Sequence, residues 1–234
     1  MCGIYGILQR SGRRLEPSVV HKMGQAQHHR GPDDSGFFAD QELMFGMQRL
    51  SIIDVEGGHQ PIANEDGTVT AVCNGEIYNF QELRRALKAQ GHTFRTGSDS
   101  EVIVHLYEEY GTDFVSHLSG MFALALWDSS RRRLLLARDR LGIKPLYITS
   151  NSGYFAFSSE LKSLLEIPGF ERQIDPAALQ EYLALGYVPA PLSMLKGIVK
   201  LPPGTILVAD HEGFAHTSCQ NQHCISPCFT SITR

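Results

Sequence analysis

The sequence has no surplus of basic residues, no long apolar run and no leader-like N-terminus, and each absence excludes a class of protein. Its 21 Lys and Arg and 25 Asp and Glu give a formal net charge of −4, which gives no indication of a nucleic-acid or membrane surface. No apolar run approaches the roughly 20 residues that span a bilayer, and no basic segment followed by an apolar stretch marks a signal peptide. Hydrophobic content of 42% and charged content of 20% are instead typical of a globular domain.

Cysteine is scarce, and its five copies are not spaced as a disulfide framework. Cysteines of odd number and irregular spacing predict a reducing, cytoplasmic setting. Three of them lie near the C-terminal end with two histidines, as Cys219, Cys224, Cys228, His216 and His223. Their spacings match no common zinc finger, and the segment lacks apolar residues to frame a site. We therefore expect no metal there and an unordered tail.

The first two residues offer a compact catalytic pair. A cysteine directly after Met1 is small enough for the methionine to be trimmed, which leaves Cys2 with both a thiol and a free α-amine. The thiolate is the nucleophilic form of cysteine, and the free thiol has a pKa of about 8.5. The α-amine titrates near ~7.7–8.0, so it is able to take the thiol proton at neutral pH. Cys2 is thus a candidate N-terminal nucleophile, although for Cys2 considered alone an unremarkable residue at a frayed terminus is the better explanation.

Short strands alternate with helices along the rest of the chain. We expect strands over residues 3–8, 45–53, 68–73, 121–127, 133–137, 146–149, 154–158 and 206–209. We expect helices over residues 17–27, 80–90, 96–110, 161–165 and 175–186, with proline or a capping residue at several starts and glycine after several ends. Groups of strands separated by helices favour two packed sheets covered by helices.

Two polar features interrupt these apolar segments. Asn74 and Gly75 follow the strand predicted over residues 68–73 and precede a helix, so an amide side chain and a bare backbone N–H are expected to face a cleft at a strand-to-helix junction. Those are the two donors that an oxyanion hole needs. Arg49 lies among apolar residues of a predicted strand. An arginine in such a place pairs with a protein carboxylate or with a substrate carboxylate, and the sequence leaves both open.

Two charged stretches are equally open to a structural explanation. Ser98 and Asp99 precede a predicted helix, and capping its N-terminus is the ordinary role for either of them. Residues 138–140 (Arg-Asp-Arg) form a charge cluster between apolar strands. A structural ion-pair network explains that cluster as well as a site does.

Six stretches in a fixed order resemble the motifs of one protein family. They are residues 1–4 (Met-Cys-Gly-Ile), 29–33 (His-Arg-Gly-Pro-Asp), 49–54 (Arg-Leu-Ser-Ile-Ile-Asp), 74–79 (Asn-Gly-Glu-Ile-Tyr-Asn), 97–101 (Gly-Ser-Asp-Ser-Glu) and 138–147 (Arg-Asp-Arg-Leu-Gly-Ile-Lys-Pro-Leu-Tyr). Over about residues 2–210 the chain resembles the glutaminase domain of the class II glutamine amidotransferases. Within that group it is similar to glutamine-hydrolysing asparagine synthetase.

The resemblance implies a fold and a set of roles. The fold is α+β, the N-terminal-nucleophile hydrolase αββα sandwich of two antiparallel sheets between helix layers. Cys2 then attacks the side-chain amide of glutamine, its freed amine acts as base, and Asn74 with Gly75 holds the oxyanion. Arg49 clasps the substrate α-carboxylate, a bidentate contact that lysine does not reproduce, and Asp99 and the region of Glu76 receive the α-ammonium. The glutamine-binding residues that the resemblance assigns are Arg49, Leu50, Ser51, Ile52, Ile53, Asn74, Gly75, Glu76 and Asp99.

The resemblance also implies a wider reaction. The glutaminase step releases ammonia through a Cys2 thioester and needs neither metal nor organic cofactor, whereas ATP and Mg belong to a synthetase domain that amidates aspartate. The expected partners are glutamine and a synthetase domain or subunit, with a homodimer as a further option and neither nucleic acid nor membrane. The alternatives are an inactive remnant that binds glutamine or a partner, a paralogue that amidates another carboxylate, and a different N-terminal-nucleophile hydrolase. The pairing of Arg49 with Asp99 argues against the last, because together they suit a free amino acid.

The synthetase half of that family carries a Ser-Gly-Gly-x-Asp-Ser phosphate loop, and the sequence has no such motif. We therefore expect one glutaminase domain over residues 2–210, followed by an unstructured tail over residues 211–234, with the synthetase domain absent. The corresponding interpretation is a truncated gene product that keeps the glutaminase half.

Overall fold

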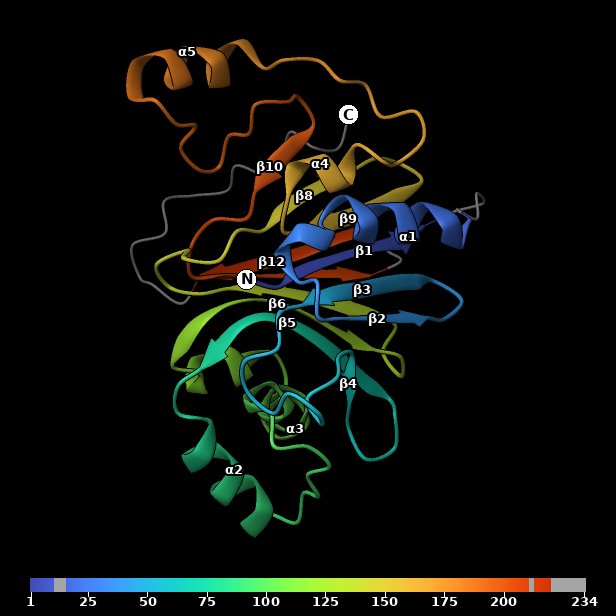
Figure 1. Ribbon diagram of the computed structural model, residues 1–234, viewed down its shortest axis with the longest axis vertical. Coiled ribbons are helices and arrows are strands. Elements are labelled where there is room, and N and C mark those ends of the chain that lie inside the picture. Colours follow the sequence, from blue (N-terminus) through green and yellow to red (C-terminus); the bar gives the residue numbers. More distant parts are fainter. Residues whose placement is uncertain (11–15, 211–212, 220–234) are drawn as a thin grey trace.

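The computed structural model describes residues 1–10, 16–210 and 213–219. Two six-stranded antiparallel sheets lie face to face, and helices cover the outer face of each (Figure 1). The layer order is therefore helix, sheet, sheet, helix, which is the αββα sandwich that the sequence predicts. Among the described residues, no helix combines the length and apolarity needed to cross a bilayer.

The first sheet carries the N-terminal strand at its centre. Its strands in spatial order are β10 (Ile198–Lys200), β8 (Tyr147–Ser150), β9 (Tyr154–Ser158), β1 (Gly3–Gln9), β3 (Leu43–Arg49) and β2 (Asp34–Ala39). Residues of β1 are buried from Gly3 to Leu8, because helices cover one face of the strand and the second sheet covers the other. A strand covered on both faces reads as a continuous apolar run, as this one does.

The second sheet contains the longest strands. Its spatial order is β12 (Gly213–Cys219), β11 (Thr205–Asp210), β7 (Arg133–Arg138), β6 (Gly120–Asp128), β5 (Val69–Ile77) and β4 (Ile62–Ala63). β5 and β6 pair along their whole length, from Val69 opposite Asp128 to Ile77 opposite Gly120. The hairpin between β6 and β7 closes where the Asp128 side chain accepts a hydrogen bond from Arg131 N at 2.9 Å.

Helices are placed by local capping signals and then held by apolar contacts. The α-helices are α1 (Pro17–Ala26), α2 (Phe80–Ala89), α3 (Val102–Tyr110), α4 (Leu161–Leu164) and α5 (Pro176–Leu185), and the 3₁₀ segments are η1 (His28–Arg30), η2 (Asp99–Glu101) and η3 (Gly111–His117). α5 shows the signals most clearly, because Asp175 accepts from Ala177 N at 2.9 Å and Gly186 ends the helix at φ +77°.

Three apolar layers hold the sandwich together. Ile4, Phe45 and Trp127 belong to the layer between the two sheets. α3 covers the outer face of the second sheet with side chains such as Ile103, and α1 covers the outer face of the first with side chains such as Met23. The burial of these side chains is the main stabilising contribution to such a fold.

Three sequence expectations about the elements are wrong. β3 ends at Arg49 rather than at residue 53, because the chain turns after it and Asp54 takes a left-handed conformation at φ +50°. β5 does not stop at residue 73, so Asn74 and Gly75 lie inside the strand rather than at a strand-to-helix junction. Close backbone packing at Gly75 allows pairing with β6 to continue past this point.

The third correction concerns the predicted tail. Residues 213–219 form β12, which pairs antiparallel with the edge of β11, so they are not unstructured. Backbone pairing to an open strand edge requires no strong side-chain pattern, so no local pattern in the sequence predicts this strand. The rest of the predicted tail, with Cys224, Cys228 and His223, lies outside the described residues.

Candidate active site

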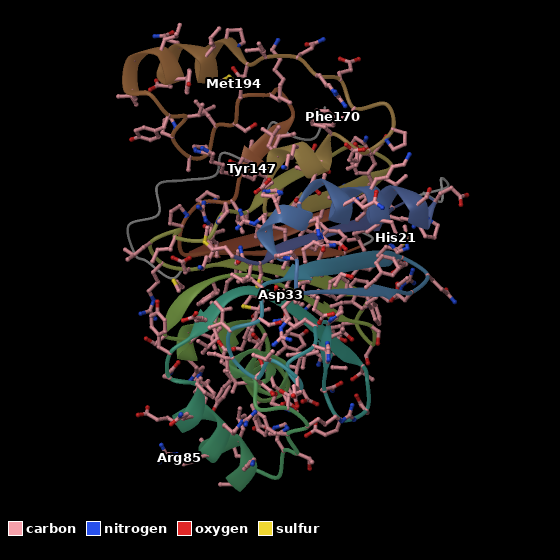
Figure 2. All side chains as sticks on the ribbon, in the orientation of Figure 1. His21, Asp33, Arg85, Tyr147, Phe170 and Met194 are labelled. Atoms are coloured by element: carbon pink, nitrogen blue, oxygen red, sulfur yellow. The ribbon has the colours of Figure 1, made fainter. Side chains whose placement is uncertain are left out.

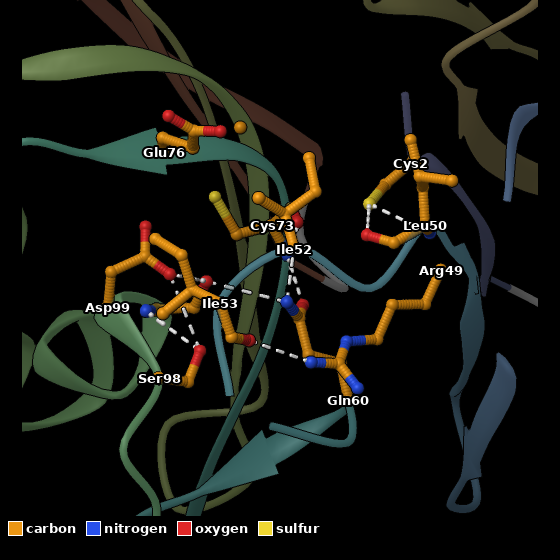
Figure 3. A pocket seen from close by; sticks show the side chains of 12 residues that line it. Cys2, Arg49, Leu50, Ile52, Ile53, Gln60, Cys73, Glu76, Ser98 and Asp99 are labelled. Carbon is orange, nitrogen blue, oxygen red and sulfur yellow. Dashed lines mark hydrogen bonds between the residues drawn. The ribbon is translucent and has the colours of Figure 1, made fainter. Parts of the chain in front are cut away.

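A pocket open to solvent lies where the start of β1, the end of β3 and the strand β5 come together (Figure 3). The first residue of this group, Cys2, packs against the apolar layer between the sheets. The pocket is lined by Cys2, Arg49, Leu50, Ile52, Ile53, Gln60, Cys73, Gly75, Glu76, Ser98, Asp99 and Ser100. Residues far apart in the sequence thus meet at one end of the sandwich.

The Cys2 thiol is positioned by the backbone of Leu50, the first residue after β3. Leu50 N donates a hydrogen bond to Cys2 Sγ at 3.4 Å, and Sγ donates to Leu50 O at 3.6 Å (Figure 3). Cys2 is only partly buried, so the sulfur is accessible from the pocket.

The backbone around Cys2 is held by the loop that precedes β2. Arg30 Nε donates to Cys2 O at 2.8 Å, and Arg30 Nη1 lies 3.1 Å from the Glu160 carboxylate. A Cβ on Gly3 would lie 2.6 Å from Gln27 Oε1, so only glycine allows the chain to approach this closely. Residues 29–33 do not line the pocket, but Arg30, which belongs to this stretch, holds the backbone of Cys2 in place.

Asn74 presents an amide without a partner. The residue is 1% exposed, and its Nδ2 is a buried donor for which the described residues supply no acceptor. Alternation along β5 places Asn74 on the same face as Val72, toward the apolar layer that Cys2 also contacts. A buried amide donor left unpaired costs free energy unless a ligand completes it.

The N–H of Gly75 is directed to the free edge of β5. On either side of it, Cys73 N donates to Gln60 Oε1 at 2.7 Å and Ile77 N donates to Asp99 Oδ2 at 2.7 Å. In an antiparallel strand every second N–H points to the same edge, so Gly75 N–H also faces away from β6, into the pocket. Asn74 and Gly75 therefore offer the two donors that the sequence predicts, but from within a strand.

A negative region lies on the other side of the pocket. Asp99 is 5% exposed, and burial raises the pKa of its carboxyl, with the nearby Glu76 carboxylate raising it further. The hydrogen bond from Ile77 N acts in the opposite direction. Two carboxyl groups that face one cavity favour a cation between them. A substrate ammonium group fits that requirement.

Arg49 does not pair with a protein carboxylate anywhere in the described ranges; it binds backbone carbonyls instead. Its Nη1 donates to Val55 O at 3.2 Å, and its Nη2 donates to Ile53 O at 3.0 Å and Asp54 O at 2.7 Å. The guanidinium has five N–H donors, so two are left for a ligand. The positive charge thus lies at the pocket wall, and it also folds residues 53–55 back against β3.

The pocket includes residues that the sequence did not single out for it. Gln60, Cys73 and Ser100 line it, and Ser98 both lines it and caps η2 by accepting from Ser100 N. Burial raises the pKa of the Cys73 thiol well above its usual range, so this second cysteine stays protonated. No local signal in the sequence points to Gln60, which reaches the pocket from the segment before β4.

Two predicted residues, Ser51 and Asn74, are not among the residues that line the pocket. Ser51 N donates to Asp33 Oδ2 at 2.9 Å, and Asp33 lies near the junction of the two sheets (Figure 2). The backbone donor of Ser51 is thus engaged by the loop before β2. Asn74 is buried, and it is the next residue along β5, Gly75, that lines the pocket.

The sequence matches a known family over nearly its whole length. Residues 1–220 match the family described as glutamine amidotransferase domain. Asparagine synthetase [glutamine-hydrolyzing] 3 of Bacillus subtilis (strain 168) is 39% identical over 217 residues, which cover 91% of this chain and 35% of that protein. Asparagine synthetase [glutamine-hydrolyzing] 1 of the same organism is 42% identical over 216 residues, covering 91% and 34%. The chain spans about a third of the length of these curated relatives.

A solved structure supports the fold independently. Glutamine phosphoribosylpyrophosphate amidotransferase from B. subtilis, complexed with ADP and GMP, is similar with a TM-score of 0.68. The match covers 94% of this chain and 50% of that one at 20% sequence identity. Similarity at this level of identity concerns the sandwich architecture alone.

Proposed function

The chain belongs to the glutamine amidotransferase domain family, and from this premise we propose that it hydrolyses the side-chain amide of glutamine through a thioester on Cys2. The observation that carries the proposal is a pocket lined by Cys2, whose thiol accepts from Leu50 N, and by Gly75, which follows the buried and unpartnered Asn74 amide in β5. A nucleophile with two nearby donors is what acyl transfer requires.

The reaction follows from these groups. After removal of Met1, the freed α-amine of Cys2 takes the thiol proton, and the thiolate attacks the amide carbon of glutamine. Asn74 Nδ2 and Gly75 N donate to the oxyanion that forms. The C–N bond then breaks, the α-ammonium returns its proton to the leaving nitrogen, and ammonia departs. Water, deprotonated by the same amine, attacks the thioester, which yields glutamate and restores the Cys2 thiol.

The charged groups of the pocket select a free amino acid. Asp99 and Glu76 suit the α-ammonium, and the two remaining N–H groups of Arg49 suit the α-carboxylate. The distance between these ends and Cys2 then selects the side chain whose amide reaches the thiol. Leu50, Ile52 and Ile53 complete the wall around the side-chain carbons.

The proposal extends to the wider reaction of the relatives. The names of the relatives support the use of this ammonia in asparagine synthesis. Aspartate, ATP and Mg²⁺ would then bind to a synthetase domain or subunit that acts together with this domain. The glutaminase step itself uses no metal or organic cofactor. A cytoplasmic location and a homodimer belong to the same proposal, and gel filtration coupled to light scattering tests the latter.

The test is intact mass before and after incubation with an electrophilic glutamine analogue, followed by an assay for glutamate and ammonia. We expect a mass that lacks Met1, one adduct, and turnover. Cys2→Ala should lose both adduct and turnover. Cys73→Ala is the matched control, because Cys73 lines the same pocket but its raised pKa keeps it protonated, so the adduct should persist. An adduct that survives in Cys2→Ala, or a trimmed chain that takes none, contradicts the proposal.

A further inference from the structure

A second cluster of ionisable side chains lies beside α3 and shares no residue with the pocket. It consists of Glu65, His92, His105 and Glu108, each of which offers one ligand atom, and these atoms all lie within 4.8 Å of one another. We propose that this cluster binds one divalent transition-metal ion of the Zn²⁺ type as a structural site.

The spacing of the ligand atoms is close to that of a tetrahedral site. Zinc bonds to nitrogen and oxygen of about 2.0–2.1 Å place neighbouring ligand atoms roughly 3.3–3.4 Å apart in a tetrahedron. His105 Nδ1 lies 3.2 Å from Glu65 Oε2 and 3.2 Å from Glu108 Oε2. His92 Nδ1 lies 3.3 Å from Glu65 Oε1 and 3.7 Å from Glu108 Oε2. A small adjustment is enough to place all four around one ion.

The outer nitrogen of His92 faces a further carboxylate, because His92 Nε2 lies 3.0 Å from Glu109 Oε1. Histidines that bind a metal usually donate their second ring N–H to a carboxylate in this way. A neutral imidazole has only one N–H, yet the His92 ring has carboxylates at both nitrogens. A metal ion at His92 Nδ1 leaves that N–H for Glu109. His105 Nε2 lies 3.9 Å from Glu101 Oε1 and has no hydrogen-bond partner among the described residues.

The carboxylates of the cluster are oriented as well. Glu65 Oε1 accepts from Thr93 N at 2.8 Å, and Glu108 Oε1 accepts from Asn64 Nδ2 at 2.8 Å. Hydrogen bonds to the second oxygen of a ligating carboxylate are a regular part of metal sites. Glu108 Oε2 lies near both histidines, whereas Glu65 approaches His105 through Oε2 and His92 through Oε1.

The two rings lie close enough together to share one ion. The ring centroids of His92 and His105 are 4.8 Å apart. The charge of a single divalent ion equals in magnitude the charge of the two ionised carboxylates of Glu65 and Glu108.

The three segments involved indicate a structural role. Glu65 comes from the turn between β4 and β5, His92 from the connection after α2, and the other two ligands from α3. Four protein ligands leave no open position for a substrate, which distinguishes a structural site from a catalytic one. Side-chain exposure of 35% at Glu65 and 28% at Glu108 leaves a path for the ion from solvent. The ion would clamp the α2–α3 layer to the edge of the second sheet.

The experiment uses the whole protein after chelator treatment, with Zn²⁺ added during calorimetric titration and thermal unfolding. We expect binding of one equivalent and a rise in Tm of about 5–10 °C at free Zn²⁺ about 100-fold above Kd. His92→Gln and Glu108→Gln should each weaken binding by at least about 10-fold. His59→Gln is the matched control, because His59 also pairs with a carboxylate, Asp34, but lies outside the cluster. It should bind as the parent does.

The visible absorption spectrum of the same preparation loaded with Co²⁺ tests whether a cysteine binds the metal. A tetrahedral site of nitrogen and oxygen ligands gives visible d–d bands without a thiolate-to-metal charge-transfer band. A charge-transfer band, unchanged binding in both His92→Gln and Glu108→Gln, or no Zn²⁺-dependent shift in Tm overturns the proposal. Two variants are used because Glu108 is partly exposed and its isosteric replacement preserves the fold even if that of His92 does not.

Discussion

The Asn74 side chain lowers the stability of the free protein but is proposed to assist the reaction. Its Nδ2 is buried without an acceptor in the described part of the chain. Asn74→Ala should therefore lower kcat for glutamine hydrolysis by about 10²–10³-fold with little change in KM, because an oxyanion donor acts in the transition state. Tm should stay within a few degrees or rise, because an unsatisfied donor is removed. Steady-state kinetics and thermal unfolding on one preparation measure both.

Asn74→Asp provides the control for this prediction. It keeps the shape of the side chain but replaces the donor with an acceptor, so it should lose activity at least as severely. Full activity in Asn74→Asp would show that the amide does not hold the oxyanion.

Asp99 makes substrate binding depend on pH. Burial and the Glu76 carboxylate raise its pKa above the ordinary value, which is about 3.9. Only the ionised form attracts the α-ammonium, so KM for glutamine should rise as the pH falls through this raised pKa. Stability moves the other way: a folded-state pKa above the unfolded one makes the contribution of Asp99 most favourable below the unfolded pKa, and it is lost as pH rises through the folded pKa.

The measurement is KM against pH for the parent and for Asp99→Asn. The variant should have a KM about 10–100-fold higher at neutral pH and no further rise on acidification from this group. Identical pH profiles for the two proteins would remove Asp99 from substrate binding.

At the scale of elements, Gly75 determines how closely β5 and β6 pack. A Cβ at this position would lie 2.1 Å from Met121 O and 2.6 Å from the Cα of Phe122. Gly75→Ala should therefore lower the free energy of unfolding by about 1–3 kcal/mol and reduce activity as well, because the neighbouring Asn74 moves with the strand. Gly153→Ala is the control, since its Cβ would meet only Asn151 Oδ1 at 3.5 Å. Denaturant unfolding compares the two, and equal stabilities would contradict the packing argument.

The connection after β7 depends on one carboxylate rather than on an ion-pair network. Asp139 is 1% exposed and accepts hydrogen bonds from the N–H groups of Phe122, Leu141, Ile143 and Lys144. The neighbouring Arg138 donates to three backbone carbonyls, and burial lowers its pKa. Arg138 and Asp139, two residues of the charge cluster in the sequence, thus hold the connection after β7 in place through hydrogen bonds to its backbone.

Asp139→Ala should lower the free energy of unfolding by at least about 3 kcal/mol, because several buried N–H donors lose their acceptor. Arg140→Ala, one residue further along and exposed, should stay within about 0.5 kcal/mol of the parent. Chemical denaturation measures both. Similar losses in the free energy of unfolding of the two variants would show that the Asp139 carboxylate makes no special contribution to stability.

At the scale of the whole molecule, α5 stands apart from the sandwich (Figure 1). Apolar side chains on α5 and just after it are exposed: Leu183 is 76% exposed, and Tyr187, two residues past the end of α5, is 61% exposed. Apolar surface of this kind favours self-association. Leu183→Glu should reduce light scattering at high protein concentration while leaving Tm nearly unchanged. An equal substitution in the core, Leu124→Glu, should instead unfold the protein, since Leu124 is fully buried. Unchanged scattering in Leu183→Glu contradicts the role given to α5.

The sequence alone determined the fold class, the family and most of the elements. Apolar alternation, Pro17 and Pro176 at helix starts and Gly186 after a helix end are local signals, and local signals act through neighbouring residues only. The position of Cys2 directly after Met1 likewise predicts, from the sequence alone, a candidate nucleophile whose own α-amine acts as the base.

Only the tertiary structure decided how these pieces meet. It directed Gly75 N–H to the free edge of a continuous strand, turned three donors of Arg49 toward backbone carbonyls, and paired residues 213–219 with β11. It also brought His92 and His105 from separate segments beside the same glutamates. Such contacts depend on how sheets and helices pack across many intervening residues, and no periodicity within a short stretch of sequence records that packing.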